Sequence, residues 1–379
     1  MQGISTRGSG RVVFAAVRLG VEAAVVDGTL VRGDVEVAGG EVVAVGLAGP
    51  GSGLAAPGFV DLQVNGYAGI DVLEADATGI AELGRALSLV GVLAYQPTLI
   101  TAPPDMARAA LDEIARALEL GGAGIIGAHL EGPFLSPARR GAHPAEWLRT
   151  PDLDLLASYL AAGCPVTTMT LAPELPGADE AIDALLTRDI RVSVGHTDAT
   201  AAQAHAAFDH GARTVTHLYN AMRPFAHRDP GVVGAALSRS DVVVQLIADG
   251  VHVAAEAILT AWRAARGRFA LVSDAIAAAG LGDGVFHLGP VEVHVENGVS
   301  RNADGTLAGA VRALDWGLRV LIELGVPIPE AVDAVTRTPA RIVGRDDLGR
   351  LAPGLPADLV VLDDDFVVSR VLRGGEPVE

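Results

Sequence analysis

The sequence predicts an α/β protein: a (β/α)8 barrel of the TIM type, with a small β-sandwich domain formed by the two ends of the chain. After Pro57, eight short apolar segments alternate with stretches rich in alanine and leucine. This alternation is typical of a parallel barrel, which needs ~250 residues. Both chain ends instead carry short apolar runs separated by glycine turns, which favours antiparallel strands. We therefore predict a small domain from residues 1–56 and 349–379, and a barrel from residues 57–348.

The barrel prediction rests on named segments. The predicted strands are Gly58–Gln63, Gly91–Thr98, Gly124–Glu131, Pro165–Ala172, Ile190–His196, Thr214–His217, Val242–Ala248 and Phe269–Asp274. Predicted helices between them include Ile80–Val90, Asp105–Leu120, Asp152–Ala162 and Ala178–Thr187. A doubly wound sheet is the structural alternative.

Three further segments are predicted to form β structure outside the barrel. Residues 285–307 contain the turns Asn297-Gly298 and Asp304-Gly305, which predict a β-hairpin insertion after the last barrel strand. The turn signals in residues 11–54 predict about four short antiparallel strands. The tail from residue 348 returns to strands, so we expect the two chain ends to meet in one sandwich.

Composition excludes several classes of function. The net charge is −18 and all 28 basic residues are arginine, so no basic stripe is available for nucleic acid and no lysine for Schiff-base chemistry or a P-loop. Apolar runs such as Val242–Ala248 are far shorter than the ~20 residues of a membrane span. The single cysteine, Cys164, excludes an internal disulfide, and Met1–Arg11 lacks an apolar export signal. We expect a cytoplasmic protein.

Polar side chains gather where the predicted barrel strands end. The carboxyl ends of barrel strands meet at one face, which is where reactive groups of such barrels lie. The residues concerned are Gln63 and Asn65 after strand one, His129 and Glu131 on strand three, His196 on strand five, His217 on strand six, His252 after strand seven and Asp274 on strand eight.

Three of these residues form a candidate metal site. Two imidazoles and one carboxylate, with a position left for water, make a catalytic zinc set, and we assign it to Glu131, His196 and His217. A lone histidine at a strand end is more often a buried structural residue, but two histidines with a carboxylate favour a metal. His129 lies on the same strand face as Glu131, and we expect it to support a ligand or pack in the barrel.

Asp274 ends the last predicted strand. Beside a metal-activated water it can accept a proton and pass it to a leaving nitrogen. A structural alternative is a cap on the following helix. His205, His210, His287 and His294 are interpreted as solvated or structural.

Several ordered motifs together resemble the N-acetylglucosamine-6-phosphate deacetylase family of the amidohydrolase superfamily. The resemblance covers essentially the whole chain. It is carried by Pro57–Asp61, His129–Phe134, Gly195–Asp198, His217–Met222, Asp249–His252, Ser273-Asp274 and the tail motif Leu351–Asp358.

The resemblance implies a role for each matching residue. Glu131, His196 and His217 match the metal ligands, and Asp274 matches the catalytic acid and base. His143 matches the histidine that polarises the acetyl carbonyl. The substrate-binding set implied by the resemblance is Gln63, Asn65, Asn220, Ala221, Arg228, His252 and Leu307. In the family the arginine that matches Arg228 reaches the phosphate from a neighbouring subunit, which implies a homodimer.

One motif departs from the superfamily pattern. Where many members carry His-x-His after strand one, this chain has Gln63-Val64-Asn65. Amides do not replace two imidazoles as strong ligands, so we expect one divalent ion per chain, Zn²⁺. Two alternatives remain open: an amidohydrolase acting on an unphosphorylated N-acyl sugar or cyclic amide, and a metal-free scaffold protein.

Overall fold

The structure is a computed structural model that describes residues 16–121 and 124–379, so the predicted lack of an export signal in Met1–Arg11 lies outside the described residues. Its centre is a sheet of eight parallel strands in the order β16-β15-β14-β13-β12-β11-β10-β7. A parallel bridge between Val64 and Ala275 joins the two edges of this sheet, which closes it into a barrel. The barrel prediction is confirmed, and the doubly wound alternative is wrong. The strands are β7 (Phe59–Val64), β10 (Val92–Ile100), β11 (Ala128–Glu131), β12 (Val166–Leu171), β13 (Arg191–Val194), β14 (Thr214–Val215), β15 (Val243–Leu246) and β16 (Phe269–Leu271).

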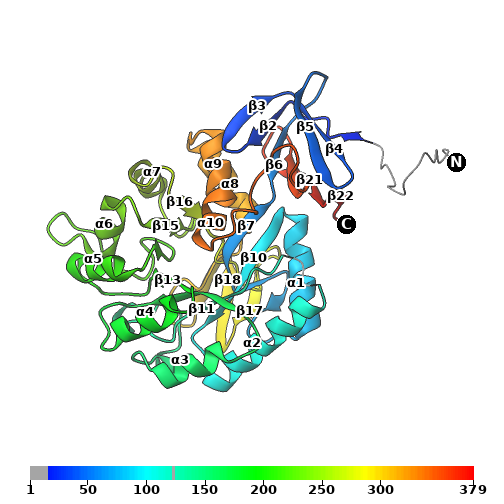
Figure 1. Cartoon of the computed structure of the whole chain (residues 1–379). Coiled ribbons are helices and arrows are strands. Elements are labelled where there is room, and N and C mark those ends of the chain that lie inside the picture. The colour runs from blue at the N-terminus through cyan, green and yellow to red at the C-terminus, as the bar shows by residue number, and fades with distance from the viewer. Residues whose placement is uncertain (1–15, 122–123) are drawn as a thin grey trace.

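Helices surround the barrel, as the alternating pattern predicts (Figure 1). Their buried residues recur on one face; on α2, for example, Ala107, Leu111 and Ile114 face the core. Polar caps fix several helix starts, such as Asp152 before α3 and the Thr200–Gln203 capping box of α5. The helices are α1 (Ala77–Leu89), α2 (Pro104–Glu119), α3 (Leu153–Leu160), α4 (Ala178–Leu186), α5 (Ala201–His210), α6 (Gly231–Ser238), α7 (Ala255–Ala264), α8 (Leu314–Glu323), α9 (Ile328–Val335) and α10 (Arg337–Ile342).

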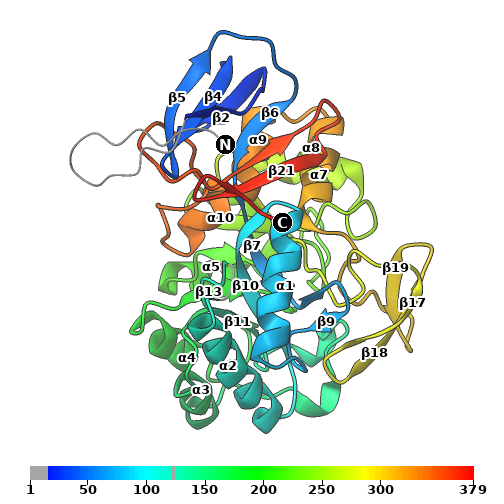
Figure 2. The ribbon, with the colours of Figure 1, turned by 90° about the vertical axis from the view of Figure 1, so that its right-hand side faces the viewer.

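The two ends of the chain meet in a small β domain beside the barrel (Figures 1 and 2). Strand β20 pairs antiparallel with β6, from Leu359 opposite Pro57 to Leu362 opposite Leu54. This pairing joins the tail directly to the segment that leads into the barrel. One sheet has the order β22-β21-β20-β6-β2-β3 and the other β1-β4-β5. Their strands are β1 (Val17–Arg18), β2 (Ala23–Val26), β3 (Thr29–Arg32), β4 (Asp34–Ala38), β5 (Glu41–Leu47), β6 (Leu54–Pro57), β20 (Leu359–Leu362), β21 (Val368–Arg373) and β22 (Glu376–Pro377).

An antiparallel insertion follows β16. It consists of β17 (Gly284–Leu288), β18 (Val291–Glu296) and β19 (Val299–Asn302). Figure 2 shows it projecting at one side of the barrel, next to β9 (Ile70–Asp71), which pairs with β8 (Gly66–Tyr67). Asp71 holds the turn between β17 and β18, because one of its carboxylate oxygens accepts a hydrogen bond from the backbone N–H of Gly289 at 2.9 Å.

The interior of the barrel is polar near the strand ends. His129 lies within hydrogen-bond distance of Thr170 at 2.7 Å, and Thr170 of Thr216 at 2.7 Å. Burial lowers the pKa of His129 to about 4, so its ring is neutral and fits the supporting role predicted for it.

None of the helices in the described residues combines the length and apolarity that crossing a bilayer requires.

Candidate active site

The predicted catalytic residues stand at, or just beyond, the carboxyl ends of four barrel strands. Glu131 is the last residue of β11, while His196, His217 and Asp274 follow β13, β14 and β16 within three residues. The backbones of these last three residues have positive φ angles of 47°, 28° and 52°. For a side chain other than glycine this conformation costs of order 1–3 kcal/mol, and such strain concentrates at functional sites. The sharp turns direct the three side chains into the barrel mouth instead of along the strands.

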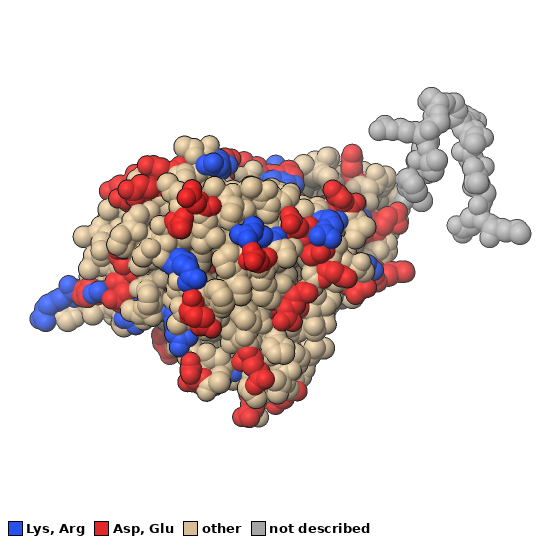
Figure 3. Space-filling model, turned by 90° about the horizontal axis from the view of Figure 1, so that it is seen from below, with Lys and Arg blue, Asp and Glu red and all other residues tan. Residues whose placement is uncertain are grey.

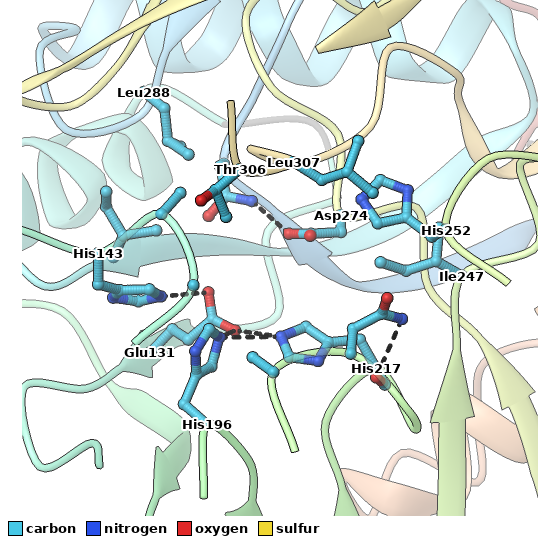
Figure 4. A pocket seen from close by; sticks show the side chains of 17 residues that line it. Glu131, His143, His196, His217, Ile247, His252, Asp274, Leu288, Thr306 and Leu307 are labelled. Atoms are coloured by element: carbon cyan, nitrogen blue, oxygen red, sulfur yellow. Dashed lines mark hydrogen bonds and ion pairs between the residues drawn. The ribbon is translucent and has the colours of Figure 1, made fainter. Parts of the chain in front are cut away.

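Glu131, His196 and His217 converge on one point (Figure 4). Nε2 of His217 lies 3.0 Å from Oε1 of Glu131 and 3.0 Å from Nε2 of His196, and the third side of this triangle is 3.3 Å. Ligand bonds of ~2.0–2.1 Å in a tetrahedral zinc site place neighbouring ligand atoms ~3.4 Å apart. The three atoms therefore match one face of such a site.

The protonation states of Glu131 and His196 also suit a cation. Nδ1 of His196 is 3.0 Å from the carbonyl oxygen of Arg139, an arrangement that puts the proton on Nδ1 and leaves the Nε2 lone pair free. Burial and the neighbouring His143 ring lower the pKa of His196 to about 4, which keeps this ring neutral. Although burial acts in the opposite direction, hydrogen bonds from His143 and His217 hold the pKa of Glu131 well below its usual range.

His143 also approaches Glu131, and by position alone Glu131, His143 and His196 form a possible metal-binding group. Its hydrogen bonds argue for a different role. The backbone N–H of Thr101 donates to Nδ1 of His143 at 3.2 Å, so Nδ1 carries the lone pair and Nε2 carries the proton in the neutral ring. Nε2 then points a donor toward Glu131, 3.6 Å from Oε2. Because a ligand nitrogen needs a free lone pair, we favour His217 as the third ligand and His143 as a hydrogen-bond donor.

Asp274 faces the cluster from the opposite side of the pocket. Its Oδ1 accepts hydrogen bonds from Nδ2 of Asn65 at 2.7 Å and Nε2 of Gln63 at 3.1 Å. Burial, followed by repulsion from the Glu131 carboxylate, raises the pKa of Asp274 to about 7 in the metal-free protein. A group that exchanges protons near neutral pH is suited to acid and base catalysis. Asp274 does not cap a helix: it is followed by an irregular segment and the insertion.

These residues line a cavity of about 310 Å³. Of the predicted substrate-binding residues, five reach it: Asn65, Asn220, Ala221, His252 and Leu307. Gln63 is fully buried beneath the cavity, where it contacts two carboxylates. Ile100, Ala142, Ile247, Leu288 and Thr306 also line the cavity, although nothing in the sequence singled them out.

The two residues expected to bind phosphate differ in their position relative to the cavity. His252 is held by Asp249, whose Oδ2 lies 2.7 Å from Nδ1 of the ring. Arg228 is exposed on the loop between Met222 and α6 and does not line the cavity. The lining residues in the described part of the chain include no arginine. On the face seen in Figure 3, acidic side chains are spread among the arginines, as the net charge of −18 implies.

A parallel barrel with two histidines, a glutamate and an aspartate at its strand ends defines a metal-dependent hydrolase of the amidohydrolase type. Comparison with known proteins agrees. The sequence profile of the amidohydrolase family matches residues 54–378. N-Acetylglucosamine-6-phosphate deacetylase of Rattus norvegicus is 38% identical over 380 residues, covering 93% of this chain and 92% of the rat protein. N-Acetylgalactosamine-6-phosphate deacetylase of Escherichia coli O157:H7 is 38% identical over 328 residues, covering 85% of this chain and 87% of that protein.

Solved structures give the same result. A mutant N-acetyl-D-glucosamine-6-phosphate deacetylase from Mycobacterium smegmatis, in complex with N-acetyl-D-glucosamine-6-phosphate, has a TM-score of 0.91 at 36% identity and covers 96% of this chain and 99% of its own. The enzyme from Thermotoga maritima has a TM-score of 0.88 at 32% identity, with the same coverage of both chains. The chain belongs to the N-acetylglucosamine-6-phosphate deacetylases of the amidohydrolase family.

Proposed function

We propose that this enzyme hydrolyses N-acetylglucosamine 6-phosphate to glucosamine 6-phosphate and acetate. The observation that carries the proposal is the triangle of Glu131, His196 and His217, which faces Asp274 across one cavity. Relatives named for this activity match over nearly the whole chain. A metal-free scaffold would have no use for three converging ligand atoms, so we set that alternative aside.

We propose one divalent ion per chain, Zn²⁺, held by Glu131, His196 and His217. When bound there, such an ion lowers the pKa of water toward ~7 and polarises the acetyl carbonyl. Gln63 and Asn65 occupy the positions at which many members of the superfamily carry His-x-His, and their N–H groups point at carboxylates. Amide donors in this orientation do not favour a second cation.

Each neighbouring residue has a defined task in this reaction. Asp274 accepts a proton from the attacking water and later donates it to the leaving amine nitrogen, as its raised pKa allows. Nε2–H of His143 donates a hydrogen bond to the acetyl oxygen as negative charge develops there. Asn220, Ala221 and Leu307 surround the sugar. His252 contacts the phosphate at the rim of the cavity.

Phosphate recognition needs a cation that the single chain does not place in its own cavity. We propose that Arg228 of a second copy supplies it, so that the enzyme acts as a homodimer in the cytoplasm. Arginine suits this task because its planar fork binds two phosphate oxygens at once. The exposed position of Arg228 supports this proposal, because its side chain is available to another chain.

An assay of acetate release tests the proposed function. Purified enzyme loaded with Zn²⁺ is offered four substrates: N-acetylglucosamine and N-acetylgalactosamine, each with and without the 6-phosphate. The galactosamine substrates are included because a relative named for N-acetylgalactosamine 6-phosphate is equally similar. We expect the phosphorylated glucosamine substrate to have the highest kcat/KM. Equal rates for the phosphorylated and unphosphorylated sugars would favour the phosphate-independent alternative, and preference for the galactosamine phosphate would change the assigned substrate.

A further inference from the structure

The side-chain amides of Gln63 and Asn65 are buried and contact the carboxylates of the site. Gln63 and Asn65 are 0% and 3% exposed, and both lie at the end of β7. Nδ2 of Asn65 donates to Oδ1 of Asp274 at 2.7 Å. The amide of Gln63 donates twice, to Oδ1 of Asp274 at 3.1 Å and to Oε1 of Glu131 at 2.9 Å. A primary amide has two N–H bonds, so Gln63 can satisfy both carboxylates at the same time.

The backbone makes this arrangement rigid. The N–H of Asp274 donates to the carbonyl oxygen of Gln63 at 3.0 Å, and the N–H of Asn65 donates to the carbonyl oxygen of Ala275 at 2.8 Å. These bonds close the barrel between β7 and the segment after β16. The amide groups and the aspartate are thus carried on two segments that are locked together. Such locked positions are required of a residue that places a reacting carboxylate.

The two oxygen atoms of Asp274 consequently differ. Oδ1 accepts two hydrogen bonds, whereas no hydrogen bond among the described residues engages Oδ2. Donors at one oxygen favour negative charge on that oxygen and leave the other free to take up a proton. The Gln63 amide also bridges Asp274 and Glu131, where two unscreened carboxylates would repel each other.

The amides are oriented entirely by their donor groups. Oε1 of Gln63 and Oδ1 of Asn65 are buried and have no hydrogen-bond partner among the described residues. Turning either amide around would place its oxygen against a carboxylate, which cannot donate a hydrogen bond, and would leave its N–H groups without the acceptors that they now have. Hydrogen bonds to charged groups are the strong ones, which accounts for the observed orientation.

We infer that Gln63 and Asn65 form an amide clamp that fixes Oδ1 of Asp274, presents Oδ2 as the atom that exchanges the proton, and separates Asp274 from Glu131 in place of a second cation. This inference rests on the proposed function, since it assigns positioning residues for that reaction. For Gln63 it replaces the substrate-binding role implied by the resemblance, because Gln63 does not reach the cavity; for Asn65, which lines the cavity, it adds a positioning role.

Two substitutions of Asn65 distinguish the effect of its N–H donor from the effect of its side-chain shape. Asn65→Leu removes the donor, and Asn65→Asp keeps the shape but places a carboxylate against Oδ1 of Asp274. We expect kcat for acetate release to fall by about 10- to 100-fold in Asn65→Leu, the effect of losing a hydrogen bond to a charged group, and further in Asn65→Asp. KM should change much less than kcat in both. If Asn65 served only as a spacer, the isosteric Asn65→Asp variant would be the more active of the two, and the inference would be wrong.

A metal-content measurement tests the same clamp without using activity. Gln63→Glu combined with Asn65→Asp places four carboxylates around one point, so this variant should bind one more divalent ion per chain than the wild type by elemental analysis. Gln245→Glu is the matched control, because Gln245 is also buried in the barrel with an unpaired Oε1 but donates to Thr214 and not to a carboxylate. The control should unfold at a lower temperature yet keep the wild-type metal content. An unchanged metal content in the double variant, with folding intact by circular dichroism, would overturn the cation-replacing role of the clamp. If the wild type released no acetate at all, the proposed function would fail while this metal readout remained interpretable.

Discussion

The two ends of the cavity are built in opposite ways. At the catalytic end, Glu131, His196 and His217 are buried, come from strand ends and lie within 3.0–3.3 Å of one another in a single chain. At the end proposed to bind phosphate, the residues come from loops, and Arg228 stands exposed outside the cavity. The comparison indicates that the barrel of a single chain is sufficient to bring the predicted metal ligands into position. Substrate recognition depends instead on loops and, in our proposal, on a second chain.

Loss of the metal should have the largest effect. His217→Ala removes one corner of the ligand triangle and one of the hydrogen-bonding partners of the buried Glu131 carboxylate. We expect the variant to purify with less than stoichiometric metal and to release acetate at background rate. Metal that binds only the folded state also stabilises it, so the melting temperature should fall.

The matched control is His210→Ala. His210 pairs with Asp183 at 2.7 Å on the surface, away from the cavity. It should keep its metal and its activity. Full metal content and activity in His217→Ala would remove this residue from the ligand set and favour His143.

Asp274→Asn should have the next largest effect. The amide cannot exchange the proton, so kcat should fall by about 10²- to 10⁴-fold while metal content and KM stay close to wild type. Single-turnover kinetics with N-acetylglucosamine 6-phosphate measure this directly. Asp34→Asn is the control: Asp34 is a buried carboxylate of the small domain that accepts backbone hydrogen bonds from Gly20, Val21 and Val35, so its loss should reduce stability and leave kcat unchanged.

Arg228→Ala should reduce kcat/KM for the phosphorylated substrate by about 10- to 100-fold, the effect of losing charge-assisted hydrogen bonds. Slow turnover of unphosphorylated N-acetylglucosamine should not change. Arg188→Ala, at an exposed arginine after α4, should alter neither rate. Equal losses on both sugars would mean that Arg228 supports the fold or the subunit contact and not the phosphate.

The smallest effect is expected at Asp198, which pairs with Arg139 at 2.8 Å and Arg223 at 3.0 Å. These bonds connect the loop that orients His196 with the loop that carries Arg228. All three side chains are about one-third exposed, so Asp198→Asn should cost less than about 1 kcal/mol in urea unfolding. A loss of kcat as large as that of Asp274→Asn would show that the geometry of the catalytic residues depends on the ion pairs of Asp198.

The catalytic end was also the part that could be predicted from the sequence. Strand periodicity and the position of Glu131, His196, His217 and Asp274 at strand ends place these residues together, because all barrel strands end at one face. Turn signals likewise predicted strands at both chain ends, and the inference that these ends meet agrees with the pairing of β20 with β6. These features depend on local pattern and on one general rule of topology.

The rest of the site depends on contacts that no local pattern encodes. Leu288 and Thr306 reach the cavity only because the insertion folds back over the barrel mouth. The donor role of His143 rests on a backbone N–H of Thr101, distant in sequence. Gln63 was expected to contact substrate, yet it lies beneath the cavity between two carboxylates, a position set by how β7 meets β16.

Mixing two impaired variants tests most directly whether the two ends of the cavity come from different chains. Arg228→Ala chains retain a working catalytic end, and Asp274→Asn chains retain a working arginine. After mild dissociation and reassociation of the mixed chains, we predict that turnover of N-acetylglucosamine 6-phosphate rises well above the sum of the separate variants, because each mixed dimer contains one complete site. Turnover no higher than that sum, with mixed dimers shown to be present by native mass spectrometry, would contradict the account and place Arg228 in the site of its own chain.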